Sequence, residues 1–118
     1  MNGKKRILVI DDDPDFREAL ELILTATGYE MIQAGSAAEG LQSLENENPD
    51  LILVDLMMEE EDSGIKFIET FRQKDDQTPV FLLSGIGSAE EYMRYGFSGV
   101  FTKPVDNNEL LGTLRQQL

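Results

Sequence analysis

The segment Ile-Leu-Val-Ile-Asp-Asp-Asp, residues 7–13, is the clearest indication of the fold in this sequence. Its apolar half has no polar alternation, which is typical of a strand covered on both faces in a parallel sheet. Residues 51–54 and 80–83 repeat this pattern. Residues 30–34 and 99–102 are more mixed, as expected for strands at the edges of a sheet. The chain is therefore predicted to form five strands with the apolar ones in the middle.

The segments between these strands carry signals for helix starts and ends. Asp13 suits an N-cap, Pro14 suits the first helical position, and Gly28 predicts the end of the first helix. An apolar stripe expected to face the core consists of Phe16, Leu20, Ile23 and Leu24. Capping boxes, in which two side chains reciprocally bind free amides, are expected at Ser36 with Glu39, Ser88 with Glu91 and Asp106 with Glu109. The third helix is expected from about Gly64 to Lys74.

Strands and helices alternate along the whole chain. Five consecutive strand-helix units with right-handed crossovers predict a three-layer α/β domain, the doubly wound (βα)5 arrangement. The edge-like second and fifth strands favour the parallel order 2-1-3-4-5 of the flavodoxin-like class. One domain, residues 1–118, is expected at this length. Ligands of such sheets bind beyond the carboxyl ends of the strands, between the first and third.

The composition excludes several kinds of chemistry. The chain has 23 acidic and 10 basic side chains, a formal net charge of -13, no cysteine and no histidine. Disulfides, thiolate catalysis, imidazole bases and most transition-metal sites are therefore excluded. Such an acidic surface would repel nucleic acid and would suit Mg²⁺ or a basic partner. Because no apolar run approaches about 20 residues or resembles a signal peptide, we expect a cytoplasmic protein without a membrane segment.

Functional side chains follow the strands. Asp11 and Asp12 come after the first strand, Asp55 after the third, Ser84 after the fourth and Lys103 after the fifth. The three carboxylates should lie close together, where two like charges 4 Å apart repel by about 4 kcal/mol at an effective dielectric of about 20. Mg²⁺, which prefers oxygen ligands, would offset this repulsion, and Lys103 adds a second positive charge. A carboxylate beside these cations can accept a phosphoryl group, so the site is predicted to support phosphoryl transfer.

With these residues in these positions, the chain resembles the receiver domain of bacterial response regulators along nearly its whole length. The segments that carry the resemblance are ILVIDDD at 7–13, PDLILVDLMM at 49–58, PVFLLSG at 79–85 and FTKP at 101–104. The resemblance implies a signalling domain of a two-component phosphorelay rather than an enzyme. It also implies partners: a histidine kinase or histidine phosphotransfer protein that donates the phosphoryl group, and an output domain or downstream protein that responds.

The resemblance also implies a role for each site residue. Asp55 would be the phosphoacceptor, which is one ligand of Mg²⁺. Asp12 would bind the ion directly and Asp11 would hold it through a water, and the backbone carbonyl of Met57 would complete the protein ligands. Ser84 would donate a hydrogen bond to the phosphoryl group, and Lys103 would pair with it. The Lys103-Pro104 peptide bond would be cis.

The sequence departs from the family pattern at several positions. Val100 stands where a switching aromatic is usual, and Ser84 and Lys103 are only 19 residues apart, which predicts a short fourth helix. Met57 and Ile86 occupy positions that tune dephosphorylation in the family, and neither can orient an attacking water, so a long-lived phosphoryl form is expected. An acidic stretch is either a solvated loop or a docking site for a basic partner; it comprises Glu59, Glu60, Glu61 and Asp62.

Two other functions fit parts of the pattern. A haloacid-dehalogenase-type phosphatase would use Asp11 as nucleophile and Asp13 as acid, but this hypothesis leaves Asp55 without a role. A flavodoxin-like electron carrier would hold the phosphate of FMN in the loop after the first strand, where Asp11, Asp12 and Asp13 would repel it. Phosphoryl transfer to Asp55 accounts for more of the residues than either alternative.

Overall fold

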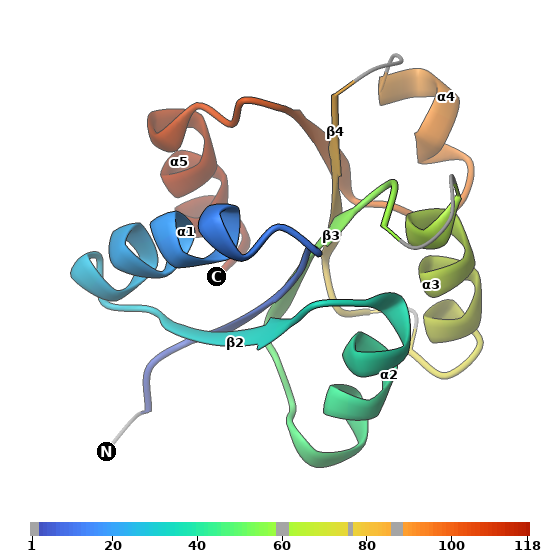
Figure 1. The fold of residues 1–118 in the computed structure, drawn as a ribbon, viewed down its shortest axis with the longest axis horizontal. Coiled ribbons are helices and arrows are strands. Elements are labelled where there is room, and N and C mark those ends of the chain that lie inside the picture. Colours follow the sequence, from blue (N-terminus) through green and yellow to red (C-terminus); the bar gives the residue numbers. More distant parts are fainter. Residues whose placement is uncertain (1–2, 59–61, 76, 86–88) are drawn as a thin grey trace.

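The computed structural model describes residues 3–58, 62–75, 77–85 and 89–118 (Figure 1). Its five strands form one parallel sheet in the order β2-β1-β3-β4-β5. The strands are β1 (Arg6–Ile10), β2 (Glu30–Ala34), β3 (Leu51–Asp55), β4 (Val80–Ser84) and β5 (Gly99–Thr102). The helices are α1 (Pro14–Ala26), α2 (Ala37–Asn46), α3 (Ser63–Arg72), α4 (Ala89–Met93) and α5 (Asn107–Gln117). The predicted three-layer (βα)5 fold with order 2-1-3-4-5 is confirmed.

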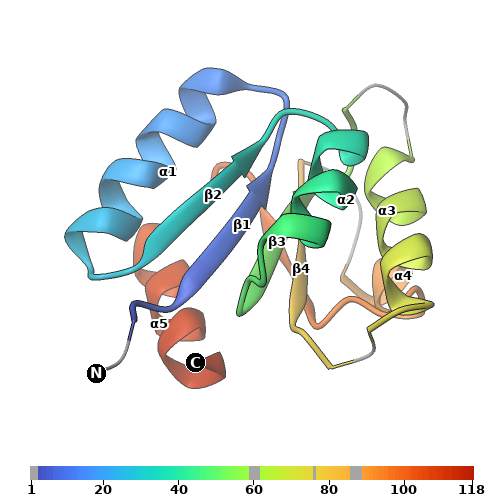
Figure 2. The same ribbon diagram turned by 90° about the horizontal axis from the view of Figure 1, so that it is seen from below.

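Each of the three central strands is buried on both faces, as their apolar runs predicted. Alternate residues such as Leu8, Ile52 and Leu82 pack with α2 and α3 on one face. Their neighbours, such as Val9 and Leu53, pack with α1 and α5 on the other face. Figures 1 and 2 show α1 and α5 on one side of the sheet and α2, α3 and α4 on the opposite side. The register of the paired strands sets the positions of the residues that follow them.

The start of α1 forms as predicted. The Asp13 side chain accepts hydrogen bonds from the backbone N–H groups of Asp15 at 3.0 Å and Phe16 at 3.4 Å, and Pro14 is the first helical residue. Gly28, which follows the helix, has a φ of 98°, a conformation that favours glycine. The N-cap therefore fixes the first turn of α1 directly above the carboxyl end of β1.

The capping box predicted at α2 is half wrong. The Glu39 N–H donates to Ser36 Oγ at 3.1 Å, as expected. The Glu39 carboxylate, however, accepts from the N–H of Gly35 at 2.7 Å, one residue before the expected amide. At α5, Asp106 accepts from the N–H groups of Asn108 and Glu109. Asp and Ser therefore act as caps, while the reciprocal glutamate contact depends on the direction of the preceding backbone.

The third helix begins at Ser63 and ends at Arg72, one residue earlier at its start and two at its end than predicted. Its first turn lies against the end of β3, because the Gly64 N–H donates to the Leu56 carbonyl at 2.9 Å. A Cβ at Gly64 would stand 2.6 Å from the Asp55 carbonyl oxygen, so only glycine allows this approach. Gly64 thereby fixes the loop that carries the residues after Asp55.

Some predictions concern residues outside the described parts of the chain. Ser88, Ile86 and residues 59–61 are among them. The last residue of the acidic stretch is described: Asp62 lies 3.6 Å from the ammonium of Lys66, four positions later on α3. The fourth helix is short, as predicted, with five residues. Within the described ranges, every helix is too short or too polar to cross a bilayer.

Candidate functional site

The structure brings Asp11, Asp12 and Asp55 together at the carboxyl edge of the sheet. Their carboxylate oxygens include three, one from each residue, that all lie within 4.8 Å of one another. The arrangement follows from strand pairing, since Ile10 of β1 is level with Val54 of β3 and an aspartate comes next on both strands. The residues that come directly after the paired ends of these two parallel strands therefore lie close together.

Ser84 and Lys103 lie at the ends of the next two strands. Ser84 is the last residue of β4 and only 3% exposed, and Lys103 follows β5. The Lys103 N–H donates to the Ser84 carbonyl at 2.9 Å, which ties the two strand ends together. The Lys103-Pro104 peptide bond is cis, as the resemblance implied. The structure therefore places the side chains singled out in the sequence along one edge of the sheet.

Lys103 is the cation of the cluster. Its Nζ donates to Asp11 Oδ2 at 2.7 Å and to Asp55 Oδ1 at 3.4 Å. The side chain of Asp11 is fully buried and that of Asp55 is 12% exposed, whereas Asp12 is exposed. Burial makes the two contacts of Lys103 stronger than those of a surface ion pair, because water screens them less.

Burial also shifts the pKa values in the cluster. Desolvation and the charge of Asp11 raise the pKa of Asp55 to about 6, against the opposing effect of Lys103. Desolvation lowers the pKa of Lys103, but its hydrogen bond to Asp11 and the charges of Asp11 and Asp55 outweigh this, so the net direction is upward. At neutral pH Lys103 is a cation and Asp55 is mostly ionised.

The carboxylate of Asp55 is accessible through a cavity of about 250 Å³. Asp55, Leu56, Met57, Gly85 and Lys103 line it. Met57 is 49% exposed at its rim. Asp11 does not line this cavity, although it contacts Lys103. Asp55 is therefore the buried carboxylate that an incoming molecule can reach.

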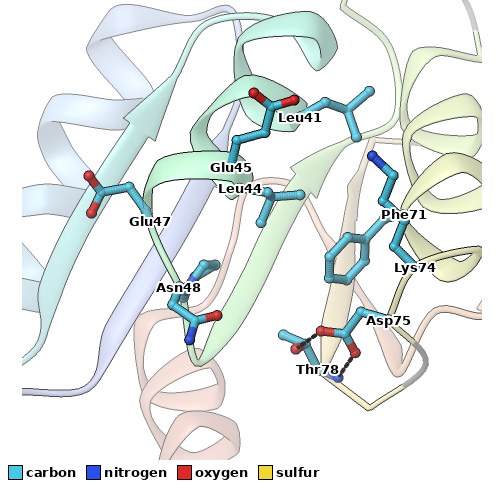
Figure 3. A pocket seen from close by; sticks show the side chains of 10 residues that line it. Leu41, Leu44, Glu45, Glu47, Asn48, Phe71, Lys74, Asp75 and Thr78 are labelled. Carbon is cyan, nitrogen blue, oxygen red and sulfur yellow. Dashed lines mark hydrogen bonds between the residues drawn. The ribbon is translucent and has the colours of Figure 1, made fainter.

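A second cavity, of about 310 Å³, lies at the opposite edge of the sheet (Figure 3). Leu41 and Leu44 of α2 face Phe71 of α3 across it. Its floor includes Asp75, which accepts hydrogen bonds from the hydroxyl and the N–H of Thr78. None of the three clustered aspartates lines this cavity, so its geometry does not bear on their chemistry.

Two residues of α1 touch the cluster without having been predicted to do so. The Phe16 ring lies under the Lys103 ammonium, with 4.6 Å between Nζ and the ring centroid. The Arg17 guanidinium donates to the Asp11 carbonyl oxygen at 2.6 Å. The apolar stripe of α1 explained Phe16 as a core residue, so nothing in the sequence marked its contact with lysine. For Arg17, its position one turn after the Asp13 cap was the available signal.

Residues 7–115 match the response regulator receiver domain family. The chain belongs to this family. A relative, the transcriptional regulatory protein GlrR of Escherichia coli K12, is 38% identical over 107 residues that cover 88% of this chain and 24% of that protein. The response regulator protein PilR of Pseudomonas aeruginosa is 33% identical over 117 residues, which cover 97% and 25%. The receiver domain thus spans about a quarter of the length of these two relatives.

Solved structures have the same fold as this receiver domain. The chemotaxis response regulator CheY4 of Vibrio cholerae is 27% identical, with a TM-score of 0.87 over 98% of this chain and 99% of that chain. A response regulator receiver protein from Pseudomonas putida is 30% identical, with a TM-score of 0.88 over 98% and 99%. Family and fold therefore agree, and neither comparison supports the phosphatase alternative with Asp11 as nucleophile.

The donor set of the receiver domain suits a hard divalent cation. Asp11, Asp12 and Asp55 offer carboxylate oxygens, the ligand type that Mg²⁺ prefers. Burial, together with the charge of Asp11, raises the pKa of Asp55 because both disfavour the ionised carboxylate. An additional cation at this point would stabilise the ionised cluster, and the site can thus hold a metal.

Proposed function

We propose that this receiver domain accepts a phosphoryl group on Asp55. The observation that supports this most directly is that Asp55 lines the accessible cavity while its carboxylate also contacts Lys103 and lies beside two further carboxylates. Asp11 is fully buried, and Asp12 lacks the lysine contact among the described interactions. Of the three clustered aspartates that the structure describes, Asp55 is the one that combines access with a neighbouring ammonium.

In the proposed reaction an Asp55 oxygen attacks phosphorus, an O–P bond forms, and the bond to the donor breaks with its electron pair leaving on the donor. The pKa of about 6 keeps Asp55 mostly ionised and nucleophilic at neutral pH. Asp11, Asp12, Asp55 and the carbonyl of Met57 would hold Mg²⁺. The bound ion would offset the negative charge of the carboxylates and the phosphoryl oxygens.

Lys103 and Ser84 would complete the site on the protein side. Lys103, already between Asp11 and Asp55, would pair with a phosphoryl oxygen and reduce its repulsion by the aspartates. Ser84, at the end of the neighbouring strand β4, would donate its hydroxyl hydrogen to another phosphoryl oxygen. These two residues would therefore contribute most once the charge of the phosphoryl group has arrived.

The contacts made by Ser84 and Lys103 would also provide the switch. Hydrogen bonds to charged groups contribute about 1.5 to 3 kcal/mol each, so two could supply most of the roughly 5.5 kcal/mol needed to invert a 1:99 population. Val100, which replaces the usual aromatic, is half-buried against the core on the side of α2 and α3. We propose that the movement of the β4 end passes to the partner surface without an aromatic relay.

The partners follow from the chemistry and the family. A histidine kinase or a histidine phosphotransfer protein would donate the phosphoryl group, because this chain has no histidine of its own. An output domain or a separate downstream protein would respond to phosphorylation. The transcriptional regulatory relative, of which the chain covers only 24%, suggests gene regulation as one such output.

The test is incorporation of phosphate from acetyl phosphate, with and without Mg²⁺. We expect labelling that requires Mg²⁺ and is lost in Asp55→Asn. Asp15→Asn is a matched control, since Asp15 is an exposed aspartate of α1 outside the cluster. Equal labelling of wild type and Asp55→Asn, or no labelling of either, would overturn the proposal.

A further inference from the structure

Four residues of the carboxyl edge form a closed circuit of contacts. The Asp13 N–H donates to Asp11 Oδ1 at 2.9 Å, and Asp13 Oδ1 accepts from the Phe16 N–H at 3.4 Å. The Phe16 ring lies 4.6 Å from Lys103 Nζ, and Nζ donates back to Asp11 Oδ2 at 2.7 Å. The first turn of α1 is thus connected at both ends to the same carboxylate.

The ring contact has a physical role that the carboxylates cannot fill. An aromatic ring has no net charge and attracts a cation through the quadrupole of its face. The contact with Phe16 therefore persists when the oxygen atoms that bind Lys103 change. Lysine has a flexible side chain with about 2 kcal/mol of rotamer entropy, and a contact along it favours one position. Lys103 is 27% exposed, so an ammonium with no ring beneath it would sample water.

From this circuit we propose that Phe16 is a positioning residue that holds Lys103 beside Asp55 for phosphoryl transfer. The inference rests on the proposed function for the reaction, and on the geometry of α1 for the contact. Asp13, the predicted N-cap of α1, acquires a further role because it fixes the turn that carries Phe16. The first turn of α1 therefore sets the position of the cation as well as the start of the helix.

A purely structural role for Phe16 is the competing explanation. Phe16 is half-buried and packs against the cluster of apolar residues under α1 and α5. If this packing were its whole contribution, Phe16→Leu would lower stability and leave the reaction unchanged. Leucine keeps apolar bulk and removes the aromatic face, whereas Phe16→Tyr retains the face. The two variants therefore separate packing from the contact with Lys103.

The first measurement is the rate constant of labelling from acetyl phosphate at saturating Mg²⁺. We expect Phe16→Leu to lower it about fivefold, the loss that corresponds to a partly exposed cation–π contact, and Phe16→Tyr to restore most of it. Tyr95→Leu is the matched control, because it removes a half-buried ring beneath Arg94, between α4 and β5. A wild-type rate in Phe16→Leu, or an equal loss in Phe16→Tyr, would overturn the inference.

The second measurement does not depend on phosphorylation. Protons over an aromatic face are shifted upfield in NMR spectra, so the ε-methylene of Lys103 should stand apart from those of the other four lysines. We expect this shift in wild type and Phe16→Tyr and its loss in Phe16→Leu. An unshifted Lys103 in folded wild type would overturn the contact itself. A shifted Lys103 in a protein that takes up no phosphate would overturn the proposed function, and with it the role of Phe16 in the reaction.

Discussion

Replacing Asp55 with asparagine should stabilise the metal-free protein, and the gain should grow with pH. Asp55 is an acid whose pKa is raised by folding, so its neutral form is favoured in the folded state. Its contribution to stability is fully present below the unfolded pKa of 3.8 and is lost as the pH rises through about 6. Asparagine stays neutral throughout and avoids this loss.

The rise in pKa sets the size of the effect. The pKa of Asp55 is 3.8 in the unfolded chain and about 6 in the folded protein. At about 1.36 kcal/mol for each pKa unit, wild type loses about 3 kcal/mol of stability once Asp55 is fully ionised. At pH 5 the loss is about half of that, because the unfolded chain is already ionised and the folded chain is not. The advantage of Asp55→Asn should therefore increase by roughly 1.5 kcal/mol between pH 5 and pH 7.5.

Urea unfolding with a chelator present measures this difference. With a slope near 2 kcal/mol per molar urea, the midpoint of Asp55→Asn should lie above that of wild type by an amount that grows by about 0.7 M over this range. Asp75→Asn is the control, since hydrogen bonds from Thr78 lower the pKa of Asp75. The pKa of Asp75 lies below pH 5 in both the folded and the unfolded chain. The difference in stability between Asp75→Asn and wild type should therefore stay constant over this range.

Mg²⁺ should act in the opposite direction. A cation that binds the folded cluster stabilises wild type by mass action, by about 2.7 kcal/mol at one hundred times its dissociation constant. Asp55→Asn lacks one of the proposed ligands, so its advantage should shrink or disappear as Mg²⁺ is added. A stability difference that is independent of pH in the presence of chelator would contradict this prediction, because burial of an ionised Asp55 would then not limit stability.

Three further predictions concern other parts of the chain. Gly64→Ala should destabilise the protein by about 3 kcal/mol or more in urea unfolding, because its Cβ would meet the Asp55 carbonyl oxygen at 2.6 Å; a loss below 1 kcal/mol would contradict this. Arg72→Met should lower stability by about 2 kcal/mol, since the guanidinium donates to three backbone carbonyls of two neighbouring loops; an unchanged urea midpoint would show that these bonds contribute little. Met57→Asn combined with Ile86→Glu should speed loss of the phosphoryl group, measured by the decay of label after the donor is removed, and an unchanged decay rate would refute the expected effect of these two side chains.

The clustering of the site could be predicted because it depends on strand pairing alone. The apolar runs of β1 and β3 are each bounded by polar residues, and pairing the two runs over their whole length brings the residues that follow them to the same edge of the sheet. The proximity of Asp11, Asp12 and Asp55 is therefore a prediction that the structure confirms. The position of Ser84 could be predicted in the same way, since Asp55 is level with Leu83 and the serine comes next on β4.

The details that were not predicted depend on the direction in which a backbone amide or a side chain points, rather than on the order of residues along the chain. Glu39 reaches Gly35 instead of Ser36, because the orientation of the preceding amide is not encoded in a spacing. Phe16 belongs to an apolar stripe, yet it lies at the end of α1 nearest the site, so its ring serves both the core and the ammonium of Lys103. The spacing of apolar residues predicts which face of a helix is buried. It does not predict which groups a residue at the end of that helix contacts.

The acidic residues that give the chain its net charge of -13 differ in how far neighbouring groups compensate their charge. Asp11, though fully buried, has its oxygens bonded to Lys103 and to the Asp13 N–H, so its charge is compensated within the protein. Among the described interactions, Asp55 has the longer contact with Lys103, at 3.4 Å, and burial raises its pKa. A cation that enters the cluster therefore gains more at Asp55 than at Asp11, because the protein compensates the charge of Asp55 less. Because Lys103 contacts both aspartates, the proposed phosphoryl group on Asp55 would draw it away from Asp11, and this would link phosphorylation to the first turn of α1.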